Sequence, residues 1–111
     1  MAAVINLSID QGSDFSLNIT AFGDGGLFLD LTDANLYSQF RRHPRSTIGY
    51  DFTATVITPE EGLFNLYISG ADTSNIRPGR FLFDVEALFS DGTRVRVTEG
   101  LLTLMPEITK I

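Results

Sequence analysis

The sequence contains no cysteine, no tryptophan and only one histidine among its 111 residues. The lack of cysteine excludes a disulfide, a cysteine-ligated zinc ion, an iron–sulfur cluster and a thiol nucleophile. No apolar run is long enough to cross a bilayer, and Met1 to Ile9 lacks the basic start of a secretory signal. We therefore expect a soluble protein with no bound metal and no cofactor.

Basic residues are scarce. The chain has 8 Lys and Arg against 14 Asp and Glu, which gives a net charge of −6. Surfaces that bind nucleic acid or anionic membranes normally carry a basic excess, so we expect neither partner. A chain of this length forms one domain that buries roughly two thirds of its unfolded surface. We predict a single domain over residues 1–111, with 106–111 as a C-terminal extension.

The dominant pattern in the chain is an alternation of apolar and polar residues with a period of two. In Phe15 to Thr20, for example, every second residue is apolar. This period is typical of strands with one dry and one wet face. It predicts strands at Ala3–Ile9, Asp14–Phe22, Asn35–Arg42, Tyr50–Ile57, Leu63–Ser69, Arg80–Phe89 and Arg94–Leu104.

Turn residues separate these segments. Thr58 to Gly62, with its Pro and final Gly, predicts that the fourth and fifth strands pair as a hairpin. Asp91-Gly92 favours a two-residue hairpin turn between the last two strands. The Gly70 to Ile76 stretch predicts one helical turn capped by Asp72.

About seven short strands in a chain of this length indicate an all-β, immunoglobulin-like antiparallel β-sandwich, with a small barrel as the alternative. The pattern Ile76-x-Pro78-Gly79-x-Phe81 resembles a tyrosine corner, although Phe81 lacks the hydroxyl that would bond back to the chain. Phenylalanines are expected to fill the core in place of the missing tryptophan and cysteine pair, namely Phe15, Phe40 and Phe83.

No combination of residues forms a catalytic constellation, so we predict that the protein is not an enzyme. His43 lies among arginines, without a serine in a nucleophile-elbow context. A general acid–base pair would come from Asp84, Glu86 or Glu99. Cross-strand ion pairs account for these carboxylates more simply, because arginines lie in the same hairpin at Arg80, Arg94 and Arg96.

The sequence gives weaker support for two kinds of ligand, calcium and carbohydrate. Asp24, Asp30 and Asp33 lie near a glycine-rich loop, but their spacing does not match an EF-hand, so calcium stays a minor alternative. Carbohydrate binding usually involves exposed tryptophan, which is absent.

Protein–protein contact is the better-supported function. The basic cluster that ends at Arg45 is a solvated loop, a contact to an acidic patch on a neighbouring subunit or, as a minor alternative, a contact to nucleic acid. The C-terminal segment alternates as an added strand does. Apolar residues such as Leu27, Phe28, Leu29, Leu82 and Leu88 are further anchors if they are exposed. The interface candidates are Arg41, Arg42, His43, Arg45, Ile108, Thr109, Lys110 and Ile111.

Four motifs carry a family resemblance: Ile9-Asp10-Gln11-Gly12-Ser13-Asp14-Phe15, Leu29-Asp30-Leu31-Thr32-Asp33, Pro78-Gly79-Arg80-Phe81-Leu82-Phe83-Asp84-Val85-Glu86, and Glu99-Gly100 followed by Pro106-Glu107-Ile108-Thr109. Through them the chain resembles small bacteriophage virion proteins with an immunoglobulin-like fold, similar to the N-terminal domain of phage baseplate upper proteins. Asp33 replaces the glycine of the family's turn, and Phe81 and Phe83 replace tyrosines.

The resemblance implies a non-enzymatic virion structural protein, made in the host bacterial cytoplasm and present in several copies per particle. Its expected place is the tail or baseplate, or a fibre adaptor, where it joins other virion proteins. Two alternatives stay open, which are a capsid decoration (cement) protein and, from a different class, a glycan-binding adsorption module.

Overall fold

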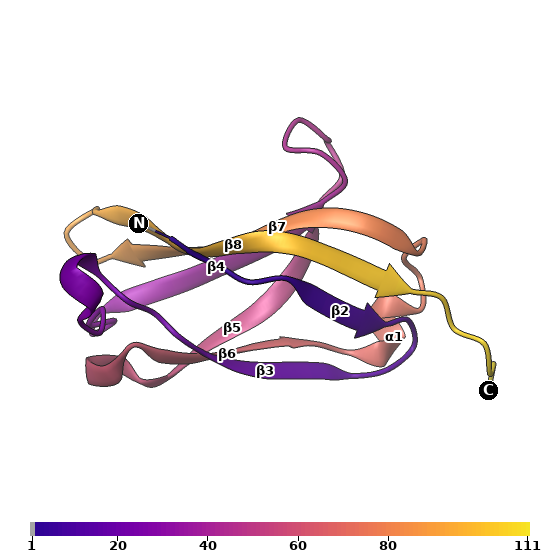
Figure 1. Ribbon diagram of the computed structural model, residues 1–111, viewed down its shortest axis with the longest axis horizontal. Helices are drawn as coiled ribbons and strands as arrows, with labels where there is room; N and C mark the ends of the chain where they lie inside the picture. Colours follow the sequence, from indigo (N-terminus) through magenta and orange to yellow (C-terminus); the bar gives the residue numbers. More distant parts are fainter. Residues whose placement is uncertain (1) are drawn as a thin grey trace.

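The computed structural model describes residues 2–111, and its regular structure is almost entirely β (Figure 1). None of the described helices is long and apolar enough to cross a membrane. The strands are β1 (Ala3–Val4), β2 (Leu7–Asp10), β3 (Phe15–Thr20), β4 (Ala34–Arg41), β5 (Tyr50–Thr58), β6 (Leu63–Ile68), β7 (Gly79–Phe89) and β8 (Arg94–Met105), with 3-10 turns η1 (Asp24–Gly26) and η2 (Pro59–Glu61) and a single helical turn α1 (Gly70–Thr73).

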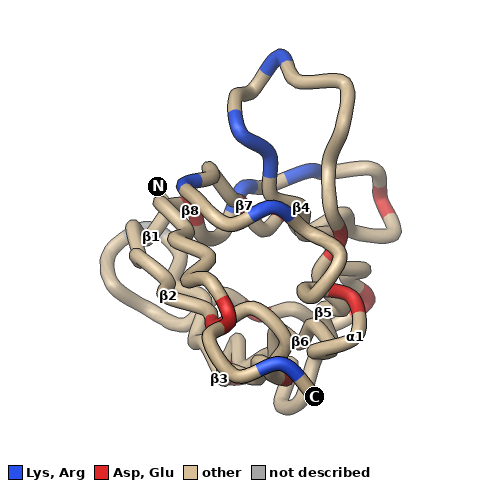
Figure 2. Tube along the Cα trace, turned by 90° about the vertical axis from the view of Figure 1, so that its right-hand side faces the viewer, with Lys and Arg blue, Asp and Glu red and all other residues tan. Residues whose placement is uncertain are grey.

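The strands form one curled sheet in the order β1-β8-β7-β4-β5-β6-β3, with β2 also on β8 (Figure 2). The predicted all-β fold and most predicted strands are confirmed. The architecture differs from two separate antiparallel sheets, because the layers are continuous and the sheet is closer to a half-barrel. Moreover, β1 and β2 run parallel to β8, whereas all other neighbours are antiparallel.

Strand β5 makes the two layers continuous. Its first residues pair with β4, ending at the pair Ser38 and Phe52. From Thr53 onward β5 pairs with β6 instead. One strand therefore belongs to both layers, and the sheet bends where its partner changes. The predicted β5–β6 hairpin is confirmed, with Gly62 at φ 68°, the left-handed conformation that closes the turn.

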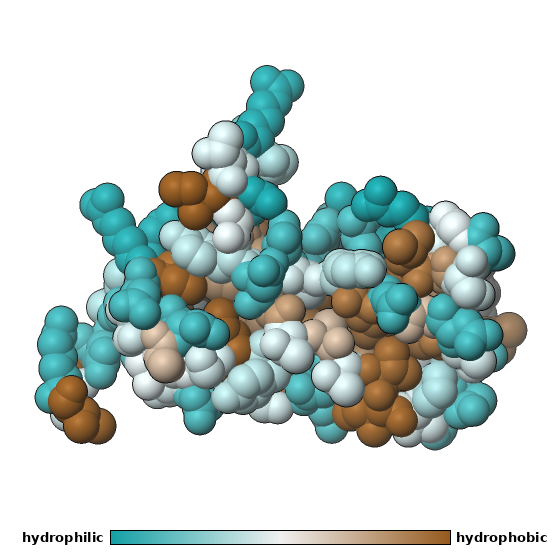
Figure 3. Space-filling model, turned by 180° about the vertical axis from the view of Figure 1, so that it is seen from behind, coloured by the Kyte–Doolittle hydropathy of each residue, from teal (hydrophilic) through white to brown (hydrophobic). Residues whose placement is uncertain are grey.

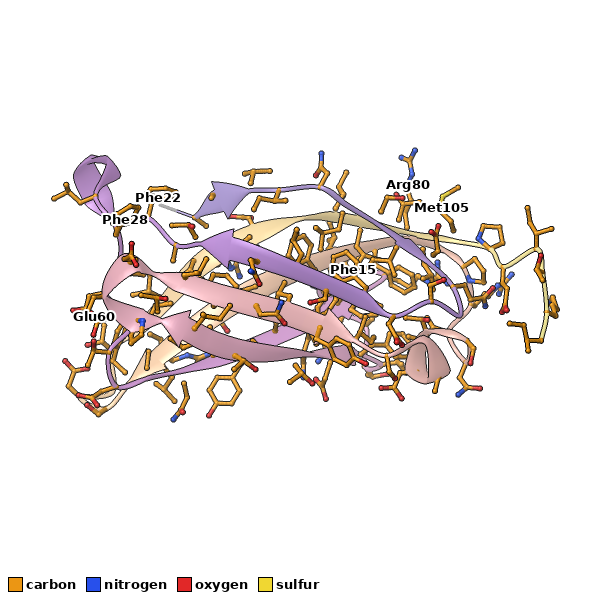
Figure 4. All side chains as sticks on the ribbon, turned by 90° about the horizontal axis from the view of Figure 1, so that it is seen from below. Phe15, Phe22, Phe28, Glu60, Arg80 and Met105 are labelled. Carbon is orange, nitrogen blue, oxygen red and sulfur yellow. The ribbon has the colours of Figure 1, made fainter. Side chains whose placement is uncertain are left out.

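Aromatic rings fill the space inside the curl. The Phe40 ring centroid lies 5.1 Å from that of Phe52 and 5.2 Å from that of Phe81. Phe52 also lies 6.3 Å from Phe83 and 6.1 Å from Phe15, the latter pointing in from the opposite layer (Figure 4). Contacts at these separations add to the hydrophobic gain of burial. The expected aromatic core is thus present, with Phe52 and Phe81 as additional members.

The first predicted strand is broken at Ile5 and Asn6, and Gly100 on β8 explains the break. A side chain at position 100 would overlap the carbonyl oxygen of Ile5, so only glycine lets the two backbones approach this closely. The Ile5 N–H donates to the Glu99 carbonyl at 2.9 Å, and the Leu101 N–H donates to Asn6 Oδ1 at 3.2 Å.

Two turn predictions need correction. The loop at Asp91-Gly92 is not a two-residue turn, because the Phe89 N–H donates to the Thr93 carbonyl and only Gly92 has positive φ. This arrangement is a three-residue loop with glycine in the left-handed position. The α1 turn is present, but its cap is Ser69, whose Oγ accepts the Asp72 N–H at 3.1 Å.

Two fully buried threonine hydroxyls differ in whether they form hydrogen bonds, so their substitutions can be compared. Thr98 Oγ1 has no hydrogen-bond partner, whereas Thr73 Oγ1 accepts the Gly12 N–H at 2.9 Å and donates to the Gly70 carbonyl at 3.2 Å. We predict that Thr98→Val raises the free energy of unfolding by ~1 kcal/mol, because it removes an unsatisfied polar atom. Thr73→Val should lower it by ~1–2 kcal/mol. Urea unfolding measures both, and a loss of stability in Thr98→Val would contradict this account.

Candidate interaction surfaces

The basic loop, residues 42–49, projects from the body between β4 and β5 (Figures 1 and 2). Arg41 stands at its base. Its Nη1 donates to the Ser46 carbonyl at 2.9 Å and its Nη2 donates to Gln39 Oε1 at 2.7 Å. Arg41 is thus engaged in holding the two arms of the loop together, a structural task that does not depend on any partner.

Arg42 is also engaged within the protein. Its Nη2 donates to the carbonyls of Arg77 and Pro78 at 2.6 and 3.2 Å, and its guanidinium carbon lies 4.1 Å from the centre of the Phe81 ring. These contacts tie the loop to the corner that precedes β7. In a tyrosine corner a hydroxyl bonds back to the chain. Here Phe81 has no hydroxyl, and Arg42 supplies the bonds to the corner carbonyls.

The outer part of the loop presents His43 and Arg45, both exposed. The Arg45 N–H donates to His43 Nδ1 at 3.1 Å, and the Ser46 N–H donates to the His43 carbonyl at 2.9 Å. These bonds fix a tight turn whose side chains face solvent. Of the four residues singled out from the sequence, only His43 and Arg45 are thus left free for an outside partner.

The C-terminal segment, residues 106–111, extends beyond the end of β8 (Figures 1 and 3). The Glu107 N–H donates to Gln11 Oε1 at 2.9 Å, and Gln11 Nε2 donates to the Ile76 carbonyl at 3.0 Å. Beyond Glu107 the apolar side chains project into solvent, since the relative exposures of Ile108 and Ile111 are 93% and 119%. Two large apolar side chains in water are costly unless something covers them.

A groove of about 710 Å³ lies on the outer face of β4, β7 and β8, with Pro44 of the loop at one side. The strand register aligns its side chains in cross-strand rows. Gln39, Asp84 and Glu99 form one row, and the next row toward the loop ends in Leu82 and Leu101. The groove therefore has a charged floor, at the row that contains Asp84 and Glu99, and beside it an apolar step formed by Leu82 and Leu101.

The charged floor is a network of ion pairs. Arg96 Nε lies 3.2 Å from Asp84 Oδ2, and Arg96 Nη1 lies 3.8 Å from Glu99 Oε1. Arg94 Nη2 lies 3.0 Å from Glu86 Oε1. The predicted cross-strand ion pairs are confirmed for Arg94 and Arg96. Arg80 pairs with none of these three carboxylates, because its register partner is Thr103 near the far end of the hairpin.

Asp84 is the carboxylate whose surroundings suit its charge least. Partial burial raises the pKa of this carboxyl, and Glu86 and Glu99 raise it further, while Arg96 and Arg41 act in the opposite direction. Desolvation outweighs the arginines because a group taken from water loses hydration that the ion pair only partly replaces.

Two acidic residues near the glycine-rich loop, Asp30 and Asp33, are explained by turn structure. Thr32 donates to Asp30 Oδ1 from its N–H at 2.9 Å and from its hydroxyl at 2.6 Å, which lowers the pKa of Asp30. Asp33 has φ 63°, the left-handed conformation that aspartate tolerates better than most residues. Within the described part of the chain, no three His, Cys, Asp or Glu side chains form a possible metal site; the Asp24 side chain lies outside that part.

An apolar cluster lies at the end of the molecule near η1. Leu27 and Phe28 are 74% and 56% exposed, and the Phe28 ring lies 5.6 Å from that of Phe22 (Figure 4). Leu82 is also exposed, whereas Leu29 and Leu88 are half-buried. Phe22 belongs to this cluster although the sequence placed it inside a strand. The nearby glycines, which end β3 early, were the available signal.

Comparison with known proteins adds no family. No protein-family model matches the chain, and no curated protein matches it significantly. Similar solved structures include an internalin-like protein of Listeria monocytogenes, with TM-score 0.45 and 13% identity over 96% of this chain and 28% of that one. A family 123 glycoside hydrolase from Clostridium perfringens gives TM-score 0.44 and 8% identity over 98% and 24%. The chain spans about a quarter of each. Likenesses this weak carry no argument about function.

The different environments of two neighbouring arginines give a second prediction. Arg42→Ala should lower the free energy of unfolding by ~1 kcal/mol, because it removes the bonds to the corner carbonyls and the contact with the Phe81 ring. Arg45→Ala, the matched control, should stay within ~0.5 kcal/mol of the parent. Equal losses in chemical unfolding of the two variants would contradict the assignment of Arg42 as an internal brace.

The pKa of Asp84 gives a third prediction. Because this pKa is raised above its ordinary value of 3.8, the folded protein holds the proton more tightly than the unfolded chain does. Stability from this group is therefore lost as the pH rises through and above 4. We expect Asp84→Asn to gain stability relative to the parent over that rise.

The control for this prediction has the opposite sign. The pKa of Asp30 is lowered below its ordinary value of 3.8, so Asp30→Asn should lose stability relative to the parent as the pH rises toward 3.8 from below. Unfolding free energies of the three proteins at pH 3 and pH 6 measure both differences. A pH-independent difference for Asp84→Asn would show that burial does not perturb this carboxyl.

Proposed function

We propose that this domain is a non-enzymatic structural component of a bacteriophage virion, in the tail or baseplate, which joins protein subunits. The family resemblance of the four sequence motifs supports the kind of particle. The all-β fold with exposed strand edges and a projecting loop supports the joining role. The partners are other virion proteins, and several copies act together in one particle.

The C-terminal segment is the observation that carries this proposal. It is anchored at Glu107 and then presents two nearly fully exposed isoleucines to solvent, instead of folding them onto the body. A domain that acted alone would be more stable if it buried these two side chains. In a particle, contacts of this small size suffice, because the scaffold supplies a high effective concentration of partners.

The groove on the outer face supports a second candidate, the glycan-binding adsorption module. Carboxylates, two guanidinium groups and amide side chains line it beside the apolar step, and groups of this kind hydrogen-bond to sugar hydroxyls. Binding on a glycan array that disappears in Asp84→Asn and Gln39→Ala would favour this candidate. An array without binders would remove it.

Localisation tests the main proposal directly. A cryo-EM map of intact particles that contain this chain is expected to place it at the tail end, beside the partner of the C-terminal segment. Density on the capsid lattice would instead identify a decoration protein. Absence of the chain from purified particles would overturn the structural role.

A fourth prediction concerns the amount of protein incorporated. Replacing Ile108 and Ile111 by serine should reduce the copies per particle several-fold while leaving thermal unfolding unchanged, because both side chains are outside the core. Leu27→Ser serves as the comparison, since Leu27 is 74% exposed in the separate apolar cluster near η1. A loss of incorporation in that variant alone would assign the joining contact to the cluster instead. Quantitative immunoblots of purified particles measure the ratio. Normal incorporation of the double variant would exclude the segment as the joining element.

A further inference from the structure

Strands β4 and β5 pair over a short stretch only. Their ladder runs from Phe40 and Tyr50 to Ser38 and Phe52 and then stops. Beyond it, within residues 2–111, β4 continues back to Ala34 with β7 as its only strand partner, and β5 continues to Thr58 with β6 as its only strand partner. The two strands therefore diverge, and residues 34–37 and 53–58 each keep one side without a strand neighbour.

A cleft of about 400 Å³ lies between the diverging halves, lined by residues 34–37 and 54–56. In a strand, alternate residues direct their N–H and C=O groups to each side, so both walls offer backbone donors and acceptors that lack a strand partner. At the far end of the β4 wall, the Ala34 N–H already donates to the Leu31 carbonyl at 3.0 Å. Leu36 and Val56 provide an apolar floor, while Tyr37 is 57% exposed at the rim. The cleft has the parts that an added strand requires.

These two edges lack the usual protection against strand addition. Natural edges are blocked by lysine, proline, bulges or covering loops. Residues 34–37 (ANLY) and 53–57 (TATVI) contain no charge and no proline, and the second stretch is rich in β-branched residues. The bulge of β5, between Val56 and Thr58, lies at the end of the second stretch and leaves residues 53–55 regular. Both edges are thus suited to receive an extended segment.

The chain itself carries a segment that fits. Residues 108–111 (ITKI) lie outside every strand, contain three β-branched residues and have the same length as the free edge 34–37. In an extended conformation Thr109 and Ile111 share one face, which matches the apolar floor, and Lys110 lies on the other face. Lys110 carries the only charged side chain of this segment, and its positive charge complements a domain of net charge −6.

The segment cannot serve its own cleft. It is anchored at Glu107 to Gln11 and leaves the body at one end of the long axis, whereas the diverging halves of β4 and β5 lie toward the opposite end (Figure 1). The molecule is 43 Å long, and four extended residues span only ~14 Å. The occupant must therefore come from another molecule.

We propose that residues 108–111 of one copy add as a strand in the β4–β5 cleft of a second copy, in a repeated head-to-tail contact. This inference rests on the proposed joining function and names a second copy of the chain as the partner. Such a contact is heterologous, so copies continue into a ring or a filament. Main-chain hydrogen bonds provide the affinity, and Ile111 on the apolar floor provides the register.

The test uses the full chain and two kinds of variant. Ile111→Asp disables the segment, and the pair Asn35→Lys with Thr55→Lys places positive charges beside the incoming Lys110; all three side chains are exposed, so folding is preserved. Thr103→Lys on β8 is the matched control, because Thr103 has strand partners on both sides. Sedimentation of the parent and the control should show association that grows with concentration. The association of each disabled variant should be weaker than that of the parent by at least about tenfold.

Mixing the two disabled variants gives the sharpest result. One retains an intact segment and the other an intact cleft, so an equimolar mixture should form a dimer that does not grow further. Hydrogen exchange should also slow in residues 34–37 and 53–57 as the parent concentration rises. A parent that stays monomeric up to its solubility limit would overturn the proposal, and so would an Ile111→Asp variant that associates like the parent.

The outcome is separable from that of the virion role. A chain present in particles but monomeric in solution would overturn only the head-to-tail contact. A chain that associates through segment and cleft but is absent from particles would overturn the virion role and leave this contact standing.

Discussion

The contact between the Phe40 and Phe52 rings is the interaction on which the rest of the structure depends. These residues lie on β4 and β5 in the short stretch where the two strands pair, with ring centroids 5.1 Å apart. Phe81 and Phe83 of β7 and Phe15 of β3 pack around them, so residues from both layers meet at one place. Burial of large rings holds the layers together there. Beyond the cluster the strands are free to diverge, which creates the bend and the cleft alike.

Strand β7 connects this core to the outer surface. Phe81, Phe83 and Val85 face inward, and the residues between them face the groove. Asp84 is therefore fixed beside the core by its neighbours, half-buried, and its raised pKa follows from a position that packing dictates. The same dependence holds at the start of the strand, where the Phe81 ring supports Arg42 and Arg42 in turn braces the loop.

The local part of this fold was predictable because its signals are local. Alternation with a period of two located the strands from β3 to β8 to within two residues, and Pro59 and Gly62 predicted the hairpin between β5 and β6. The failures depend on distant contacts. Nothing near Ile5 reveals that Gly100 lets its carbonyl approach, so the broken first strand and its parallel pairing with β8 were not readable. The change of partner along β5 was equally hidden, since both halves of the strand have the same period.

The candidate surfaces show the same difference between features set by local sequence and features set by distant contacts. Arg41, Arg42 and Arg45 look alike in the sequence, yet their roles differ because the carbonyls that engage the first two come from Ser46 and from the distant Arg77 and Pro78. The sequence placed residues 106–111 outside the predicted strands, and the structure ends β8 at Met105 accordingly. The acceptor cleft was not predictable from the sequence, because an unpaired edge arises where two strands separate and no single stretch of sequence encodes it. The bend that the aromatic core imposes therefore leaves an open edge at one end of the molecule, while the anchor at Gln11 directs an extended segment from the other. A chain with these two features at opposite ends is suited to repeated contact between copies, since each contact leaves one free cleft and one free segment for the next.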